Sequence, residues 1–319
     1  MARNYLNLSI CDMQIGDSVE GFFLLSEANV KTSGTGSSYL AGKLKDAGGT
    51  IDFKIWDYAS DIHEHAGEIV KIRGSVSEYR GTLQLKIDQI RPVREDDVYD
   101  LSLIVPCAPI DPEGEAAFVL DSLKEIRDET YRAIALKVYE RMGEALKKLP
   151  AAKSMHHAFV GGWLMHTSDM MQLAFAVANI YGTVLDEDLL LCGVFCHDIG
   201  KRREFLLSQS GLVSDYSVAG NLLGHSVMGA QEVADAAREL GYAPDSEKVM
   251  LLQHMLLSHH GVPEWGAAVV PCTIEAEVLS LLDRLDARIE AYCEALDKTP
   301  VGEMSDYIRS FEHAVYRHR

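Results

Sequence analysis

The sequence lacks the features that mark several large classes of protein. No stretch of the 319 residues approaches the roughly 20 apolar residues of a membrane-spanning helix, and the first residues form no apolar signal region. The six cysteines are scattered and include no CxxC pair, which argues against a structural zinc site built from thiolates. We therefore expect a cytoplasmic protein with no membrane partner.

Basic residues are also in short supply. The chain has 30 lysines and arginines against 48 acidic residues, and its formal net charge is −18. This balance argues against a protein that coats nucleic acid in general, because such proteins are usually basic. It does not exclude nucleic acid as a substrate, since bound metal ions and a local basic strip can offset the overall field. The length suggests two domains or one large domain.

Residues 15–94 have the pattern of a small β domain. Short apolar or alternating segments occur at 17–30, 39–44, 51–56, 69–76 and 83–90. A short helix fits between the third and fourth of them, and this order predicts an OB-fold barrel. The glycine-rich loop at 33–38 lacks the GxxxxGK[ST] pattern, so we interpret it as a hairpin connection and not as a phosphate-binding loop.

The β domain has a basic strip and several aromatic residues. Six basic and two acidic residues between Lys71 and Arg94 give a local balance of +4. A basic groove with aromatic stacking faces is how such barrels hold single strands; the alternative is that the aromatics are core and the lysines a solvated face. The candidate contacts for a single strand are Tyr39, Lys43, Phe53, Lys54, Trp56, Lys71, Arg73, Tyr79, Arg80 and Lys86.

Helical periodicity replaces the β pattern after residues 95–112, an acidic and proline-containing segment that we expect to be a linker. Asp186 is a predicted N-cap for a helix that ends near His197. The other expected helices lie within 114–149, 158–181, 225–240, 246–260, 274–295 and 303–319. The predicted fold is therefore multi-domain, an all-β OB-fold barrel followed by an all-α domain over 113–319.

Histidines and aspartates next to apolar residues recur in five of these helices. They are His166, His197, Asp198, His225, His259, His260 and Asp283. A single such histidine is usually a satisfied core residue, but seven ligand-type residues in one helical domain favour a metal site, because buried charge needs a partner. Imidazole and carboxylate ligands favour Mn, Fe, Co or Zn in an open site. Seven ligands suit two ions about 3.5–4 Å apart, an arrangement suited to phosphodiester hydrolysis, with Asp198 as the bridge.

The order of His166, His197-Asp198 and Asp283 resembles the H…HD…D signature of the HD-domain metal-dependent phosphohydrolases. The amino-acid sequence around these residues is similar to that of the YhaM family over 156–167, 197–201, 223–225, 257–261 and 283–288. The segments 51–57 and 79–85 of the β domain are similar to that family as well. The resemblance covers residues 15 to about 295 of the sequence.

The resemblance implies a 3′→5′ exoribonuclease that trims single-stranded RNA, with DNA as a second candidate polymer. It implies two divalent ions, with Mn²⁺ the usual metal and Fe, Co, Ni, Zn or Mg as alternatives. The first ion would be held by His166, His197, Asp198 and Asp283. The second would be held by His225, His259 and His260 with Asp198 shared. Lys201 would join Asp198 in catalysis by contacting a phosphate oxygen, although an ordinary surface lysine is the other interpretation.

Further roles and two competing functions stay open at this point. Asp286 is placed to orient a ligand histidine, and Arg284 and Arg288 would contact phosphates or form helix salt bridges. The pair His156-His157 is expected near the site entrance. One competing function is hydrolysis of small nucleotides with a regulatory OB module. The other is a nucleic-acid-binding protein whose helical site is only structural. A homo-oligomer is compatible with all of them.

Overall fold

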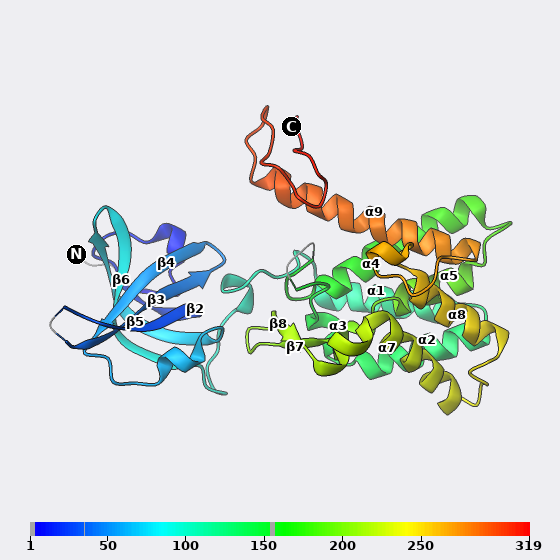
Figure 1. Ribbon diagram of the computed structural model, residues 1–319, viewed down its shortest axis with the longest axis horizontal. Helices are drawn as coiled ribbons and strands as arrows, with labels where there is room; N and C mark the ends of the chain where they lie inside the picture. Colours follow the sequence, from blue (N-terminus) through cyan, green and yellow to red (C-terminus); the bar gives the residue numbers. More distant parts are fainter. Residues whose placement is uncertain (1–3, 35, 154–156) are drawn as a thin grey trace. The chain divides into compact units, whose positions relative to one another are not determined.

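The computed structural model describes residues 4–34, 36–153 and 157–319 (Figure 1). The chain divides into two compact units. One is built on the chain up to Cys107 and includes Leu207–Ser214; the other comprises Ala108–Leu206 and Asp215–Arg319. His156, which the sequence placed near the site entrance, lies outside the described residues.

The first unit is a closed β-barrel. Its strands are β1 (Asn4–Leu6), β2 (Ser18–Thr32), β3 (Ser38–Asp46), β4 (Gly49–Trp56), β5 (Ile69–Tyr79) and β6 (Thr82–Pro92). They follow the order β1-β2-β3-β4-β6-β5, and β5 also pairs with β2, so that β2 to β6 close on themselves. This is the strand order of an OB-fold, and the predicted barrel is confirmed. The short 3₁₀ helix η2 (Ile62–His65) stands between β4 and β5.

Alternation along β4 separates core from surface. Ile51 and Phe53 are buried in the barrel core, whereas Asp52 is exposed and Trp56 keeps 57% of its surface exposed. The expectation that Phe53 contacts a nucleic acid strand is therefore wrong, because its ring is 1% exposed and is packed inside the barrel. The period of two places Phe53 on the face opposite Lys54 and leaves it no route to a ligand.

The second unit is helical (Figure 1). Its α-helices are α1 (Pro112–Glu125), α2 (Glu129–Met142), α3 (Ala145–Lys148), α4 (Gly162–Tyr181), α5 (Glu187–Cys196), α6 (Lys201–Glu204), α7 (Val218–Glu239), α8 (Glu247–Ser258) and α9 (Ile274–Asp297). Along the chain, the hairpin strands β7 (Phe205–Leu207) and β8 (Val213–Tyr216) stand between α6 and α7. Further short 3₁₀ helices lie at Ile10–Asp12 and Leu101–Leu103 in the first unit and at Pro263–Trp265 in the second.

Helix α5 is the centre of this unit. Every side chain from Leu189 to Cys196 is buried, and the helix packs against α2, α4, α8 and α9. Asp186 is its N-cap, as predicted, with a carboxylate that accepts a hydrogen bond from the Leu189 N–H at 3.0 Å. Because α5 is apolar on all sides, its position is fixed by packing, and the polar residues that follow it are held at the centre of the unit.

The prediction of a helix over 303–319 is wrong. Helix α9 ends at Asp297, and the chain then forms isolated bridges between Met304 and Tyr316 and between Ile308 and His313. The Arg317 guanidinium donates to the carbonyls of Leu296 and Thr299, each at 2.8 Å, and so satisfies carbonyl groups at the end of α9. Within the described ranges, no helix is both long enough and apolar enough to span a membrane.

Candidate metal centre

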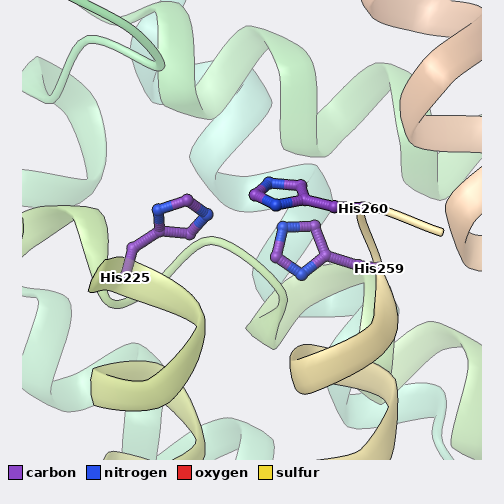
Figure 2. A group of neighbouring side chains, drawn as sticks. All are labelled: His225, His259 and His260. Carbon is purple, nitrogen blue, oxygen red and sulfur yellow. The ribbon is translucent and has the colours of Figure 1, made fainter. Parts of the chain in front are cut away.

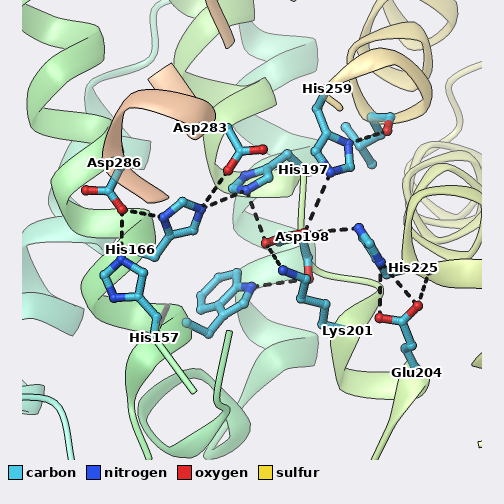
Figure 3. A network of polar contacts seen from close by, with 12 residues as sticks. His157, His166, His197, Asp198, Lys201, Glu204, His225, His259, Asp283 and Asp286 are labelled. Atoms are coloured by element: carbon cyan, nitrogen blue, oxygen red, sulfur yellow. Dashed lines mark hydrogen bonds and ion pairs between the residues drawn. The ribbon is translucent and has the colours of Figure 1, made fainter. Parts of the chain in front are cut away.

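The seven histidines and aspartates singled out in the sequence lie around one centre in the helical unit (Figures 2 and 3). They arrive from α4, from the end of α5, from α7, from the end of α8 and from α9. Of the seven, His166, His197, Asp198 and His259 are at most 3% exposed. The residues form two neighbouring groups, and Asp198 lies between them.

The first group contains His166, His197, Asp198 and Asp283. The Nε2 atom of His166 is 3.3 Å from the Nε2 atom of His197 and 3.3 Å from Oδ1 of Asp283. The Nε2 atom of His197 is 3.3 Å from Oδ2 of Asp198. Ligand atoms of His166, His197 and Asp198 lie within 4.8 Å of one another, close enough to share one cation, and Asp283 adjoins them through its contact with His166.

The second group contains His225, His259 and His260, whose rings converge from α7 and the end of α8 (Figure 2). Their ligand atoms lie within 4.8 Å of one another. The other oxygen of Asp198, Oδ1, is 3.4 Å from Nε2 of His225 and 3.8 Å from Nε2 of His259. The two oxygens of Asp198 thus face different groups, as a bridging carboxylate requires.

Helix ends orient two of these histidines. The Nδ1–H of His197 donates to the carbonyl of Val194 at 2.7 Å, and the Nδ1–H of His259 donates to the carbonyl of Leu256 at 2.6 Å. Both carbonyls belong to the last four residues of their helices, where no later amide of the helix satisfies them. Because a carbonyl only accepts, Nδ1 carries the proton and the Nε2 lone pair points into the centre.

Carboxylates orient two others (Figure 3). Asp286 accepts from Nδ1 of His166 at 2.6 Å and from Nε2 of His157 at 2.9 Å, so the contact expected of Asp286 is present. Glu204 accepts from Nδ1 of His225 at 3.1 Å and from its backbone N–H at 3.0 Å. Glu204 could not be recognised from the sequence alone, because α6 has only four residues and its position against α7 depends on tertiary packing.

Two glycines allow α7 to approach the centre. A Cβ atom on Gly200 would lie 2.0 Å from the carbonyl oxygen of His225, so only glycine permits this close approach. Gly224 has a φ of 73° and breaks α7 just before His225, a left-handed conformation that other residues rarely adopt. His225 follows this break directly, and its ring centre lies 5.4 Å from that of His259.

Unpartnered atoms show that the residues present fit a bound cation. Among the described residues, the buried atoms Oδ1 of Asp198, Nε2 of His225, Nε2 of His259 and Nδ1 of His260 have no hydrogen-bond partner. Each such atom costs about 1–3 kcal/mol when it is left unsatisfied. Burial lowers the pKa of His259 and of His260, so both rings are neutral, the form that binds a metal ion.

Charge is concentrated around the first group. Burial opposes protonation of His166, but its hydrogen bonds with Asp283 and Asp286 outweigh burial and raise the pKa of the ring to about 10. Burial of Lys201 is likewise outweighed by Asp198, which raises the lysine pKa; its Nζ lies 2.6 Å from Oδ2 of Asp198. The surrounding carboxylates thus favour positive charge both on the His166 ring and on Lys201. A divalent ion bound at Nε2 of His166 would take the place of the proton on that nitrogen, because a coordinated imidazole is neutral.

A cavity of about 180 Å³ opens onto this centre. Its lining includes His166, Asp198, Lys201 and Asp283 from the site and Arg284 at the rim. Lys201 has 16% of its side chain exposed and reaches this cavity directly. The cavity thus combines oxygen and nitrogen ligands with an ammonium group that is ion-paired to Asp198.

Several predicted strand contacts gather on one face of the barrel. The Tyr39 and Trp56 rings lie opposite each other on β3 and β4 with centroids 4.9 Å apart. The Lys54 ammonium lies 4.6 Å from the ring centre of Tyr79, and the Arg80 guanidinium lies 5.3 Å from it. Lys54 also stands next to Lys86 in the pairing of β4 with β6. We call these residues the barrel patch: Tyr39, Lys54, Trp56, Tyr79, Arg80 and Lys86.

The remaining basic candidates lie elsewhere or are paired. Lys43 is bound to Glu27 at 2.8 Å. Lys71 lies 3.4 Å from Glu20, and with Arg73 it lines a separate depression between β2, β5 and β6. The charge of Lys43 and of Lys71 is therefore partly neutralised within the barrel, whereas the cations of the barrel patch have no ion pair within the described ranges.

Comparison with known proteins gives a family match for the helical unit. A model described as "HD domain" matches residues 163–288, which contain all seven ligand-type residues and Asp286. The helical unit therefore contains an HD domain, and the barrel that precedes it has the OB-fold strand order.

Solved structures are similar to parts of the chain. The second OB-fold domain of replication protein A from Methanococcus maripaludis is 21% identical and matches 30% of this chain and 99% of that chain, with a TM-score of 0.24. The HD domain of the L. monocytogenes phosphodiesterase PgpH is 17% identical and matches 49% of this chain and 73% of that chain, with a TM-score of 0.29.

Proposed function

We propose that this protein is a divalent-metal-dependent 3′→5′ exonuclease of the YhaM type that hydrolyses single-stranded RNA, with single-stranded DNA as an alternative polymer. The observation that carries the proposal is the position of Asp198 between two groups of histidine and carboxylate ligands. Its Oδ2 atom faces His197 and its Oδ1 atom faces His225 and His259. A carboxylate in this position is typical of a site for two ions.

The ligands are held ready for this chemistry. His166, His197, Asp198 and Asp283 would hold one ion, and His225, His259 and His260 with Asp198 would hold the other. Two bound ions, with Mn²⁺ as the first candidate, would supply a hydroxide nucleophile at neutral pH and charge stabilisation at the phosphorus oxygens.

Residues of this chain position and neutralise the substrate. Carbonyl oxygens and carboxylates fix the ring orientations through Nδ1 of His166, His197, His225 and His259. Lys201 donates to Asp198 at 2.6 Å and is the cation nearest to the bridging oxygen. In this position its ammonium group would contact a phosphate oxygen and stabilise the charge that develops in the transition state.

The size of the cavity favours the end of a polymer over an enclosed nucleotide. Its volume of about 180 Å³ is below the roughly 300–1,000 Å³ of sites that enclose a small molecule. A phosphodiester group fits inside while the rest of the strand lies outside. The barrel patch combines exposed aromatic rings with cations that make no ion pair to any described residue, which is the composition of a single-strand platform.

The test is an incubation of the metal-loaded protein with 5′-labelled RNA and Mn²⁺. Stepwise shortening from the 3′ end supports the proposal, whereas an intact oligomer with hydrolysed free nucleotides supports a small-nucleotide phosphohydrolase. The variant Asp198→Ala is expected to lose hydrolysis and keep RNA binding. Asp235→Ala, which removes an exposed carboxylate on α7, is the matched control. Retained turnover in Asp198→Ala would refute the bridging role.

A further inference from the structure

The cavity at the metal centre shares one lining residue, Arg284, with a second surface feature. This residue lines the cavity and also a shallow groove of about 750 Å³ along α9. The groove is lined by Leu281, Arg284, Leu285, Arg288, Ile289, Tyr292 and Cys293. Arg284 therefore marks one side of the cavity, which we call the exit, and the groove beside it has both apolar and cationic lining.

Trp265 lies beside this exit. It belongs to the 3₁₀ helix Pro263–Trp265, directly after the ligand pair His259-His260. The segment is anchored on His260: the Val262 N–H bonds to the His260 carbonyl at 3.0 Å, and a Cβ on Gly266 would lie 3.1 Å from Nδ1 of that ring. Although it is anchored, Trp265 is 58% exposed. The Arg284 guanidinium lies 4.7 Å from its ring centre.

The cations at this exit are available to a ligand. Over the ranges the structure covers, neither Arg284 nor Arg288 has a carboxylate within ion-pair distance, in a chain whose net charge is −18. Each instead lies over an aromatic ring, Arg284 over Trp265 and Arg288 over Phe311 at 4.7 Å. A guanidinium that lies over an indole keeps its N–H groups at the edge for phosphate oxygens. The pairing is therefore suited to a ligand with both an aromatic ring and a phosphate.

We propose that Trp265 and Arg284 form the subsite for the 3′-terminal nucleotide of a single-stranded nucleic acid. The cavity of about 180 Å³ is smaller than sites that enclose a nucleotide-sized molecule, so the terminal base would lie outside it, on the side of Arg284. The base stacks on the exposed indole of Trp265, and Arg284 contacts the phosphate. This inference rests on the proposed function, and it identifies the part of the strand that the metal centre receives.

Two model substrates distinguish an effect on nucleotide binding at the subsite from an effect on the hydrolytic step. Thymidine 5′-(p-nitrophenyl phosphate) carries a nucleoside in the position of the terminal nucleotide, and methyl p-nitrophenyl phosphate carries a methyl group there. The variant Trp265→Ala is expected to lower kcat/KM for the thymidine ester by about 5-fold to 100-fold, mainly through KM, as the loss of one base–aromatic stack does. For the methyl ester, Trp265→Ala is expected to have the same kcat/KM as the wild type. Trp265→Phe is expected to retain most of the wild-type kcat/KM for the thymidine ester.

Tyr181→Ala is the matched control, because Tyr181 is 56% exposed at the end of α4 and lines neither the cavity nor the groove. A second measurement does not need turnover. Thymidine 5′-monophosphate is expected to quench tryptophan fluorescence in the variant Trp56→Phe and not in the double variant Trp56→Phe/Trp265→Phe, where Trp163 remains.

The outcomes distinguish the two proposals. Equal losses on both esters, or no loss on the thymidine ester, would overturn the subsite while the proposed function stands. A lower apparent molecular mass of Trp265→Ala than of the wild type in size-exclusion chromatography would also overturn the subsite. The groove would then be the contact surface for a second copy of the chain. If the wild type cleaves neither ester with Mn²⁺, the proposed function fails, and the fluorescence result alone supports or overturns nucleotide binding at Trp265.

Discussion

Each of two carboxylates orients a histidine in a different ligand group, which allows a test of whether the two groups bind separate metal ions. Glu204 contacts only His225 of the second group, at its Nδ1 and its backbone N–H, and Asp286 contacts His166 of the first group. In Glu204→Gln, one amide oxygen replaces two carboxylate oxygens, and the amide NH₂ then faces a donor. One hydrogen bond and the negative charge are lost, while the size of the side chain is kept.

The expected magnitude follows from what such contacts contribute. Removal of a partner that orients a metal ligand typically lowers metal affinity by about 10-fold to 100-fold, which is about 1.4–2.8 kcal/mol. We expect Glu204→Gln to weaken one of two Mn²⁺ sites by this factor and Asp286→Asn to weaken the other. Isothermal titration calorimetry with Mn²⁺ on each variant and on the double variant measures both sites.

The pattern across the variants decides the prediction. Two independent single losses that add in the double variant agree with two sites joined at Asp198. Weakening of both sites by either single variant, or one Mn²⁺ per chain in the wild type, would refute the assignment of Glu204 and Asp286 to different ions. Thermal melting of each variant in the absence of metal serves as the control for folding.

Three further predictions concern Lys201, the barrel and Gly200. Lys201→Ala is expected to lower kcat about 100-fold to 1,000-fold with Mn²⁺ content unchanged, as loss of a preorganised charge-stabilising group does; an unchanged kcat would make it a surface lysine. Trp56→Ala is expected to weaken RNA binding about 5-fold to 100-fold with stability unchanged, whereas Phe53→Ala should cost about 3–5 kcal/mol of stability; filter binding and denaturant melts separate them. Gly200→Ala is expected to cost about 1–3 kcal/mol through contact with the His225 carbonyl, and an unchanged melting temperature would contradict this.

Patterns with a local physical cause could be predicted from the sequence. The period of two in 51–56 predicts a strand, and the apolar run of α5 behind an Asp186 cap predicts a buried helix that delivers His197 and Asp198 to the interior. The same alternation also predicts that Phe53 points inward, which is incompatible with a contact to a nucleic acid strand. The sequence shows which residues of the barrel are aromatic. Which of them are exposed depends on whether each position in the strand points inward or outward.

Features that depend on tertiary contact could not be predicted. Glu204 is one of many acidic residues in the sequence, and its role appears only when α6 lies against the start of the His225 segment. The C-terminal segment has helix-forming residues, but Arg317 folds back onto the end of α9 and the segment remains irregular. In both cases a long-range contact outweighs a local preference.

The positions of His197 and His259 suggest why helix ends suit this centre. Each histidine follows the last residue of an apolar helix, and each donates to the carbonyl three residues earlier. One hydrogen bond thereby satisfies a carbonyl that the helix leaves open, fixes the ring tautomer and points Nε2 inward. A histidine in mid-helix lacks such a carbonyl, and His166 uses the carboxylate of Asp286 instead. Ligands at helix ends therefore need no separate orienting side chain. Among substitutions of orienting side chains, we expect weaker metal binding only for those of Asp286, which orients His166, and of Glu204, which orients His225.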